Sequence, residues 1–238
     1  IFFLIVSAIW FGTSNAAREI VSERAIYLRE RMVNLGLFNY VFSKYVLLAF
    51  FCIVQCSMLL GIVFFGLGLP GGMDAFGQML GACIATALVA VALGLLISTL
   101  VTSSEAAMAL TPIALIPQVI LGGLLVPMTS VPHLKYLFLA IPSRWGFEAA
   151  IVPNRLALEE DKSWSIDLMM PQPVSSVDDF ITDGEFKCAT AQIAAEKLKG
   201  SWGFFTYETQ WLPYAVLGGV TIVLLVLLCM VLKRRDPV

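Results

Sequence analysis

The chain has 238 residues, of which 59% are hydrophobic and 13% charged, and its mean hydropathy is +0.87. Soluble domains carry about 25% charged residues, so this composition excludes an ordinary soluble domain and a disordered chain. The net charge of -2 provides no basic field for nucleic acid, and five cysteines with one histidine exclude a disulfide-dense scaffold and disfavour a protein-built zinc site.

Four long stretches contain no charged residue: 45–73, 75–104, 106–134 and 209–232. A helix needs about 20 apolar residues to cross a bilayer. The stretches lack the alternation of a strand, so helices are expected. We predict an all-α, polytopic membrane protein with spans at 45–68, 76–101, 106–127 and 211–232, and the end of a fifth span at 1–12.

The charges outside these stretches predict an orientation. Lysine and arginine gather in 15–44 and in the tail after residue 232, whereas 151–210 is acidic. Basic residues near span ends mark the cytoplasmic side. Counting spans from a cytoplasmic 15–44 also puts the tail inside and 128–210 outside, so both arguments agree. Residue 1 is then outside, and we expect a sixth span upstream and a plasma or inner membrane location.

Segment 16–35 is predicted to form one amphipathic connecting helix in the membrane interface, with Asn15 as its N-cap. Its apolar stripe would be Val21, Ala25, Leu28, Met32 and Leu35, and the glutamates on the opposite face would be Glu19, Glu23 and Glu30. Two interpretations stay open. The helix is either a surface anchor or, through its acidic face and Ile26, a docking surface for a cytoplasmic partner.

Two further local patterns predict structural roles. Thr102 and Glu105 have the spacing of a capping box, which favours a structural role for Glu105 over a partner contact. Cys52 and Cys56 have the spacing of a metal pair but no third ligand, so core packing is the better interpretation. Gln55, on the same face, is expected to form an interhelical hydrogen bond.

The region after residue 127 is expected outside the membrane. A re-entrant pair of short helices is predicted at 133–150, broken at Ile141 and Pro142. Arg144 and Glu148 have i,i+4 spacing and either pair near the membrane face or simply face external water. Residues 151–210 form an external segment whose Cys188 is free or bonded to another chain. No catalytic constellation is present in the sequence, so we expect no enzyme in this chain.

Three short stretches carry a resemblance to a known family. They are REIVSER at 18–24 with YLRER at 27–31, GLLV at 123–126, and IPSRWGFEA at 141–149. Together they resemble the membrane domain of an ATP-binding-cassette (ABC) exporter of the type-2 permease class, similar to the white and multidrug G subfamily.

The resemblance implies a bundle of six spans that pairs with a second permease copy, as a homodimer or a heterodimer. Membrane lipid would surround the pair. A cytoplasmic ATP-binding domain, in the same or another chain, would bind ATP and Mg; this chain would hold no cofactor or metal and bind no nucleic acid. The residues implied for coupling to the ATPase are Glu19, Glu23, Arg24, Ile26, Glu30 and Glu105. Those implied for the pathway and its valve are Phe2, Phe3, Gln118, Leu121, Leu124 and Leu125, and Arg144 and Glu148 form the re-entrant pair.

The function predicted from sequence is therefore export of an amphipathic or lipid-like substrate, by alternating access at a dimer interface. The alternatives are a secondary transporter or channel, and a non-transporting signalling scaffold. The predicted spans contain neither a carboxylate nor an inverted repeat, which disfavours the secondary transporter. A Walker A motif upstream or in a neighbouring chain would favour the exporter.

Overall fold

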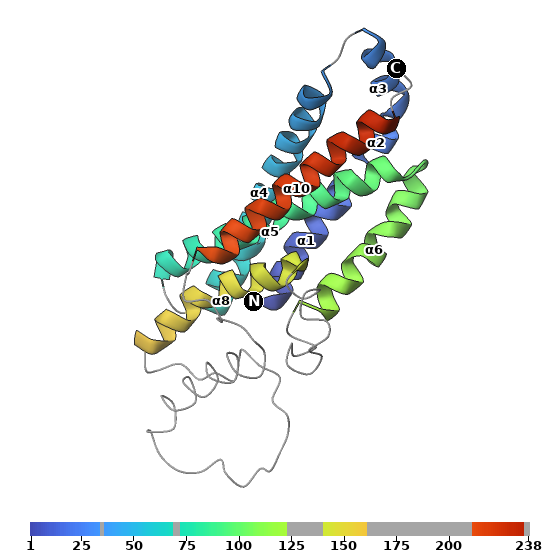
Figure 1. Ribbon diagram of the computed structural model, residues 1–238. Coiled ribbons are helices and arrows are strands. Elements are labelled where there is room, and N and C mark those ends of the chain that lie inside the picture. Colours follow the sequence, from blue (N-terminus) through green and yellow to red (C-terminus); the bar gives the residue numbers. More distant parts are fainter. Residues whose placement is uncertain (34–35, 69–71, 123–139, 161–210, 236–238) are drawn as a thin grey trace.

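The computed structural model describes residues 1–33, 36–68, 72–122, 140–160 and 211–235, with side chains only to residue 151 in the fourth range. Within these ranges the regular elements are all α-helices, which form an elongated bundle (Figure 1). They are α1 (Phe2–Ala16), α2 (Glu19–Ser22), α3 (Arg24–Met32), α4 (Leu37–Leu67), α5 (Gly72–Leu100), α6 (Ser104–Ile120), α8 (Pro142–Glu160) and α10 (Leu212–Arg235).

The prediction of an all-α membrane protein is confirmed for the described residues. Three helices, α4, α5 and α10, are long and apolar enough to cross a membrane. Helix α4 begins at Leu37, earlier than the span predicted at 45–68, and α5 begins at Gly72. Helix α1 continues to Ala16, beyond the expected end at residue 12. Helix α6 ends at Ile120, so it is shorter than the predicted 106–127, of which 123–127 lies outside the described residues.

Helix α5 lies at the centre of the bundle and packs most closely against α1. A Cβ at Gly12 of α1 would lie 2.6 Å from the carbonyl oxygen of Ala87. A Cβ at Gly94 of α5 would lie 2.7 Å from the Cβ of Ala16. Small residues on both helices thus bring the two backbones into contact. Because lipid tails are as apolar as the side chains, the hydrophobic effect does not hold membrane helices together, and close van der Waals packing of this kind does so instead.

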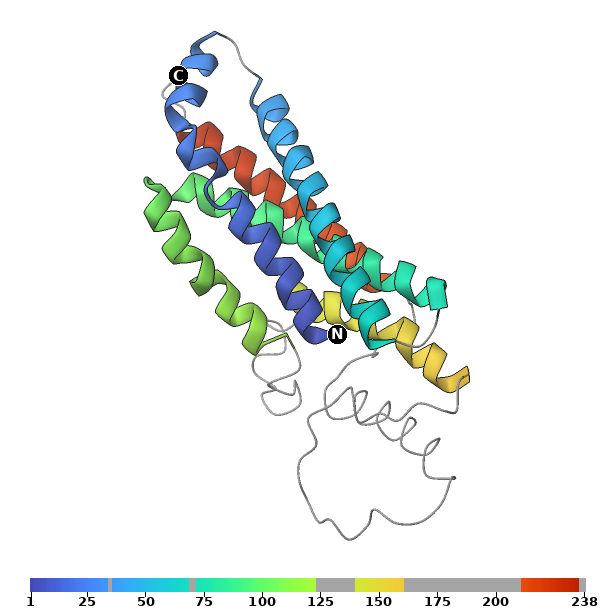
Figure 2. The ribbon, with the colours of Figure 1, turned by 180° about the vertical axis from the view of Figure 1, so that it is seen from behind.

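Helix α8 crosses the end of the bundle that lies opposite α2 and α3 (Figure 2). Its Gly146 packs against Thr86 of α5, and the Thr86 hydroxyl occupies the space that a Cβ at position 146 would need. Trp145 packs beside it in a buried cluster with Val89 of α5 and Leu217 of α10. The predicted break at Pro142 is confirmed as the start of α8, whereas 133–139 lies outside the described residues.

The single connecting helix predicted at 16–35 is corrected by the structure. The chain leaves helical geometry at Glu23, where φ is -100° and ψ is 8°, and α2 and α3 are separate short helices. The predicted apolar stripe is consequently divided: Val21 is buried against α6, whereas Met32 is 77% exposed. Leu35 lies outside the described residues. Asn15 is not an N-cap, because it lies within α1.

Helix ends elsewhere follow local chemistry. Gly68 ends α4 in the left-handed region, with φ of 59° and its amide bonded to the Phe64 carbonyl, a conformation that glycine adopts without penalty. The capping box predicted for Thr102 is shifted by one residue. Ser103 is the N-cap of α6, and its side chain accepts a hydrogen bond of 3.2 Å from the amide of Ala106.

The interpretation of the α4 cysteines as core residues is confirmed. Cys52 and Cys56 are both buried in the main hydrophobic cluster, between α4 and α5. The expected interhelical bond of Gln55 is also present: the side-chain amide of Asn15 donates to its Oε1 over 3.0 Å.

Candidate functional site

The end of the bundle that carries α2 and α3 is called the charged end below. At its centre the Nζ of Lys44, on α4, lies 2.8 Å from Oε1 of Glu19 and 2.5 Å from Oε2 of Glu23. The lysine side chain is only 16% exposed, and the two glutamates are 25% and 39% exposed. One cation therefore joins α2 and the residue before α3 to α4. Two of the three predicted acidic residues thus face inward to Lys44 instead of forming a free acidic surface.

Aromatic packing supports the same junction. Tyr27 of α3 and Tyr40 of α4 are both buried, with ring centroids 4.8 Å apart. Beside them lies a cavity of about 380 Å³ with Glu23, Ile26 and Glu30 on its α3 side. Tyr40, one turn before Lys44, is on its α4 side. The cavity is open and its lining is mixed in polarity, so it offers both charge and apolar contact to a protein that approaches from this end.

Helix α2 is also held to the end of α5. The Oγ of Ser98 accepts hydrogen bonds of 3.0 Å from the amides of both Ile20 and Val21. These are first-turn amides that α2 cannot satisfy itself, so a serine from another helix acts as its cap. Arg235 of α10 donates to the carbonyls of Thr99, over 2.5 Å, and Leu100, over 2.9 Å, at the end of the same helix.

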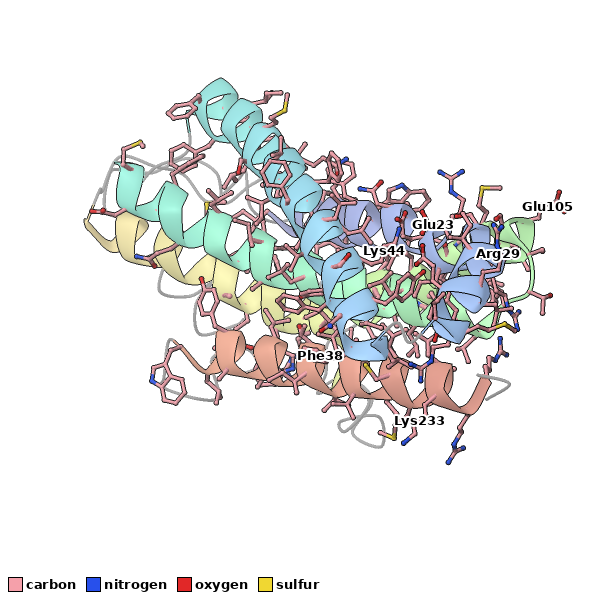
Figure 3. The ribbon with its side chains drawn as sticks, turned by 90° about the horizontal axis from the view of Figure 1, so that it is seen from above. Glu23, Arg29, Phe38, Lys44, Glu105 and Lys233 are labelled. Atoms are coloured by element: carbon pink, nitrogen blue, oxygen red, sulfur yellow. The ribbon has the colours of Figure 1, made fainter. Side chains whose placement is uncertain are left out.

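The predicted coupling residues are therefore distributed over two places. Glu19, Glu23, Ile26 and Glu30 surround the Lys44 junction; Ile26 is 48% exposed and Glu30 is exposed. Arg24 faces the opposite side of α3, where it lines a small pocket with Ser98 and Arg235. Glu105 is exposed at the start of α6, away from Lys44 and Glu23 (Figure 3).

The opposite end of the bundle contains the predicted charged pair. Arg144 and Glu148 lie on successive turns of α8, with Nη2 and Oε2 4.0 Å apart, and their side chains are only 2% and 5% exposed. The guanidinium carbon of Arg144 lies 5.1 Å from the centre of the Trp145 ring. The interpretation in which both residues face external water is wrong. Since buried ions cost several kcal/mol each, this pair is a functional candidate.

The predicted pathway residues at this end do not share one environment. Gln118 of α6 is buried and bonded twice to Ser143 of α8. Phe2 is buried edge-on against Phe147, with ring centroids 5.3 Å apart. Phe3, in contrast, is 77% exposed. Leu121 is half-buried, and Leu124 and Leu125 lie outside the described residues.

The sequence did not predict the contacts of four residues in these sites: Lys44, Ser98, Ser143 and Arg235. Lys44 is the last charged residue before a long apolar stretch, and from the sequence it contributes only to the basic charge that orients 15–44. Serines are common in membrane helices, and their spacing does not show which distant amide they will cap. Among the described residues, no group of three or more His, Cys, Asp or Glu side chains could hold a metal ion.

Comparison with known proteins decides the family. The family model described as "ABC-2 type transporter" matches residues 1–153, which run from α1 into α8 and include both ends described above. The chain belongs to the ABC-2 type transporter family. Its membrane helices are the permease part of an ABC transporter, and the protein is an integral membrane protein that acts in transport.

A relative in Mycobacterium tuberculosis, the ABC transporter ATP-binding/permease protein Rv1747, is 30% identical over 178 residues. The match covers 68% of this chain and 20% of that protein, so the ABC-2 permease described here spans about a fifth of its relative's length. The relative's name combines an ATP-binding and a permease function.

Proposed function

We propose that this ABC-2 permease exports an amphipathic or lipid-like substrate, driven by ATP hydrolysis in a cytoplasmic ATP-binding domain that binds ATP and Mg. The chain itself would contribute no catalytic group. It would form six spans with a segment upstream and resemble the G subfamily. The charged end would be cytoplasmic and 128–210 external. The basic tail of α10, at the same end as α2 and α3, supports this orientation (Figure 1).

The observation that carries the proposal is the attachment of α2 and α3 to the spans. Lys44 connects Glu19 and Glu23 to α4, and Ser98 connects α2 to α5. A surface anchor lying loosely on lipid would need neither connection. Since both connections end on spans, a push on α3 would be transmitted to α4 and α5.

This arrangement divides the proposed coupling residues by role. Ile26 and Glu30 are exposed beside the cavity, so they would touch the ATP-binding domain, with Arg24 and Glu105 on the flanks. Glu19 and Glu23 would act as positioning residues through Lys44. An apolar side chain with carboxylates around it is a common docking pattern, because the apolar group supplies contact area and the charges orient the partner.

The pathway would run between two copies of the permease, beside α1 and α6. Phe3 is exposed on α1 and would line it. Phe2 and Gln118 are buried within one copy and would support the pathway by holding α8. Leu121, Leu124 and Leu125 would form the valve, since apolar constrictions gate by excluding water.

The test uses the full-length transporter in proteoliposomes with a fluorescent phospholipid analogue. ATP-dependent movement of the analogue across the bilayer is measured alongside ATP hydrolysis. We expect movement to require ATP, and Ile26→Glu to lower movement per ATP hydrolysed several-fold. Met32→Glu is the matched control, because Met32 is also an exposed apolar residue of α3 but does not line the cavity.

Two outcomes would contradict the proposal. Movement of the analogue at equal rate without ATP would indicate a channel or facilitator. Hydrolysis without movement of this or any other amphipathic probe would favour the signalling scaffold. Equal losses in Ile26→Glu and Met32→Glu would remove the coupling role of the cavity while leaving the transport activity standing.

A further inference from the structure

A groove on the outer surface of the bundle separates α4 from α10. Its volume is about 550 Å³, within the range of about 300–1,000 Å³ typical of small-molecule sites. The wall from α4 includes Phe38, Phe42 and Tyr45, and the wall from α10 includes Ile222, Val226 and Lys233. Both helices are candidate membrane spans, so bilayer lipid is the medium that meets this groove.

The shape of the groove fits an acyl chain. From Ile222 to Lys233 it follows α10 for about 16 Å, at about 1.5 Å per residue. That length is about half of the 30 Å hydrocarbon core, or one leaflet. On the other wall the rings of Phe38 and Phe42 stack at 13° to each other, with centroids 5.9 Å apart. They present a smooth apolar wall towards α10, where Figure 3 places Phe38.

Charge is present at one end only. Lys233 is the single charged residue lining the groove in the described part of the chain, and no described residue pairs with it. It lies at the charged end of the bundle, where a headgroup would sit. The neighbouring Arg235 is already engaged by the carbonyls of α5, and Arg234 does not line the groove. The groove is therefore apolar over about the length of one leaflet and has the Lys233 ammonium at one end.

We propose that an anionic phospholipid of the bilayer occupies this groove, with an acyl chain between α4 and α10 and its phosphate on Lys233. The site is separate from the proposed pathway, because α6 lies on the other side of α1 and α5 from α4 (Figures 1 and 2). The bound lipid fills a gap between two spans and is held there, whereas a substrate passes through. The inference does not depend on what the transporter moves.

The test is retention of lipid by the detergent-purified transporter after exposure to phosphatidylglycerol and phosphatidylcholine with identical chains in equal amounts, read by native mass spectrometry. The unmodified protein is expected to retain phosphatidylglycerol in preference. A lysine near a membrane surface contributes about 1 kcal/mol to binding of anionic lipid, so Lys233→Gln should reduce the preference about five-fold. Arg234→Gln removes the same charge one residue away and should leave the preference unchanged.

A second pair of variants tests the apolar part of the groove. Val226→Trp fills the groove and should abolish retention of both lipids. Val223→Trp is the control, because Val223 is an exposed residue of α10 that does not line the groove. Because Lys233 is exposed, its replacement should not disturb folding. The Lys233→Gln measurement therefore remains informative even if a tryptophan variant fails to fold.

Three results would overturn the proposal. Equal effects of Lys233→Gln and Arg234→Gln would indicate unspecific surface attraction. Undiminished retention in a folded Val226→Trp protein would place the lipid elsewhere. Absence of bound lipid from the unmodified protein would indicate that a second copy or another segment covers the groove.

Discussion

Ser143 and Gln118 are joined by two hydrogen bonds. The hydroxyl of Ser143 donates to the backbone carbonyl of Gln118 over 2.6 Å, and its amide donates to the side-chain Oε1 of the same residue over 3.2 Å. Ser143 lies in the first turn of α8 and Gln118 in the last turn of α6, so these bonds fix the start of one helix to the end of the other. A movement of α6 therefore carries α8 with it.

Replacement of this serine should loosen the junction. Ser143→Ala leaves the buried Gln118 carbonyl without that donor, which costs about 1–3 kcal/mol of folding free energy. We expect a lower melting temperature in detergent together with reduced transport. Ser57→Ala is the control, since the Ser57 hydroxyl bonds only to Ile53 of its own helix and should be nearly neutral. Equal melting temperatures for the two variants would show that the junction is not stabilising.

Removal of the Lys44 cation should uncouple α2 and α3 from α4. Lys44→Met leaves Glu19 and Glu23 next to each other without their cation. Partly exposed pairs contribute little to global stability. The main expected effect is therefore fewer molecules transported per ATP, with only a small change in melting temperature. Lys44→Arg should recover much of the coupling.

The matched control for Lys44 is Arg29→Met, which removes one exposed cation from α3 (Figure 3). It should leave the ratio of transport to hydrolysis near that of the unmodified protein. A normal ratio in Lys44→Met would return α2 and α3 to the simple anchor interpretation.

The contact of Gly146 with Thr86 should not tolerate a side chain. Gly146→Ala places a Cβ against the Thr86 hydroxyl, and overpacking of this kind costs about 1–3 kcal/mol. The melting temperature should fall, and Thr86→Ala in the same protein should restore part of the loss by removing the clashing atoms. Gly218→Ala on α10 has open space around its Cβ and is expected to be neutral. No rescue by Thr86→Ala would mean that the clash is not the cause.

The buried pair on α8 should behave as a coupled unit. Arg144→Met leaves the buried carboxylate of Glu148 without its neighbouring cation, and such losses cost about 3–5 kcal/mol. The double variant Arg144→Met with Glu148→Leu should be more stable than the single variant, because the buried carboxylate has then been removed together with the cation. A double-mutant cycle on melting measures this coupling. Additive effects would show that the two residues do not interact.

The proposed orientation can be measured directly with an impermeant thiol reagent on intact cells. Cys188→Ser provides the background, because the remaining cysteines, at positions 52, 56, 83 and 229, are buried or partly buried. Ser22→Cys, at an exposed position of α2, should be labelled only after permeabilisation, whereas Ser175→Cys should react from outside. The reverse pattern would invert the topology.

The sequence by itself determined the membrane character and the apolar parts of α4, α5 and α10, but not where α4 begins. A run of apolar residues without charge is a property of the chain, and the bilayer requires each such segment to satisfy its own backbone. It also determined that Pro142 begins a helix, since proline suits a first turn. The motif around Arg144 was also recognisable in the sequence. The burial of Arg144 and Glu148 was not, because the spacing of residues on one helix does not show which other helices pack over them.

Only the tertiary structure decided how the charged end is built. The start of α2 is capped by Ser98, a residue of α5 that lies 77 or more positions away in the chain. The amphipathic pattern of 16–35 predicted a continuous helix because periodicity reads only local order. In the same way, the three glutamates of that segment looked equivalent, yet two of them bind Lys44 and one remains exposed. Which carboxylate finds the cation depends on the position of α4, and that position is set by packing against α5.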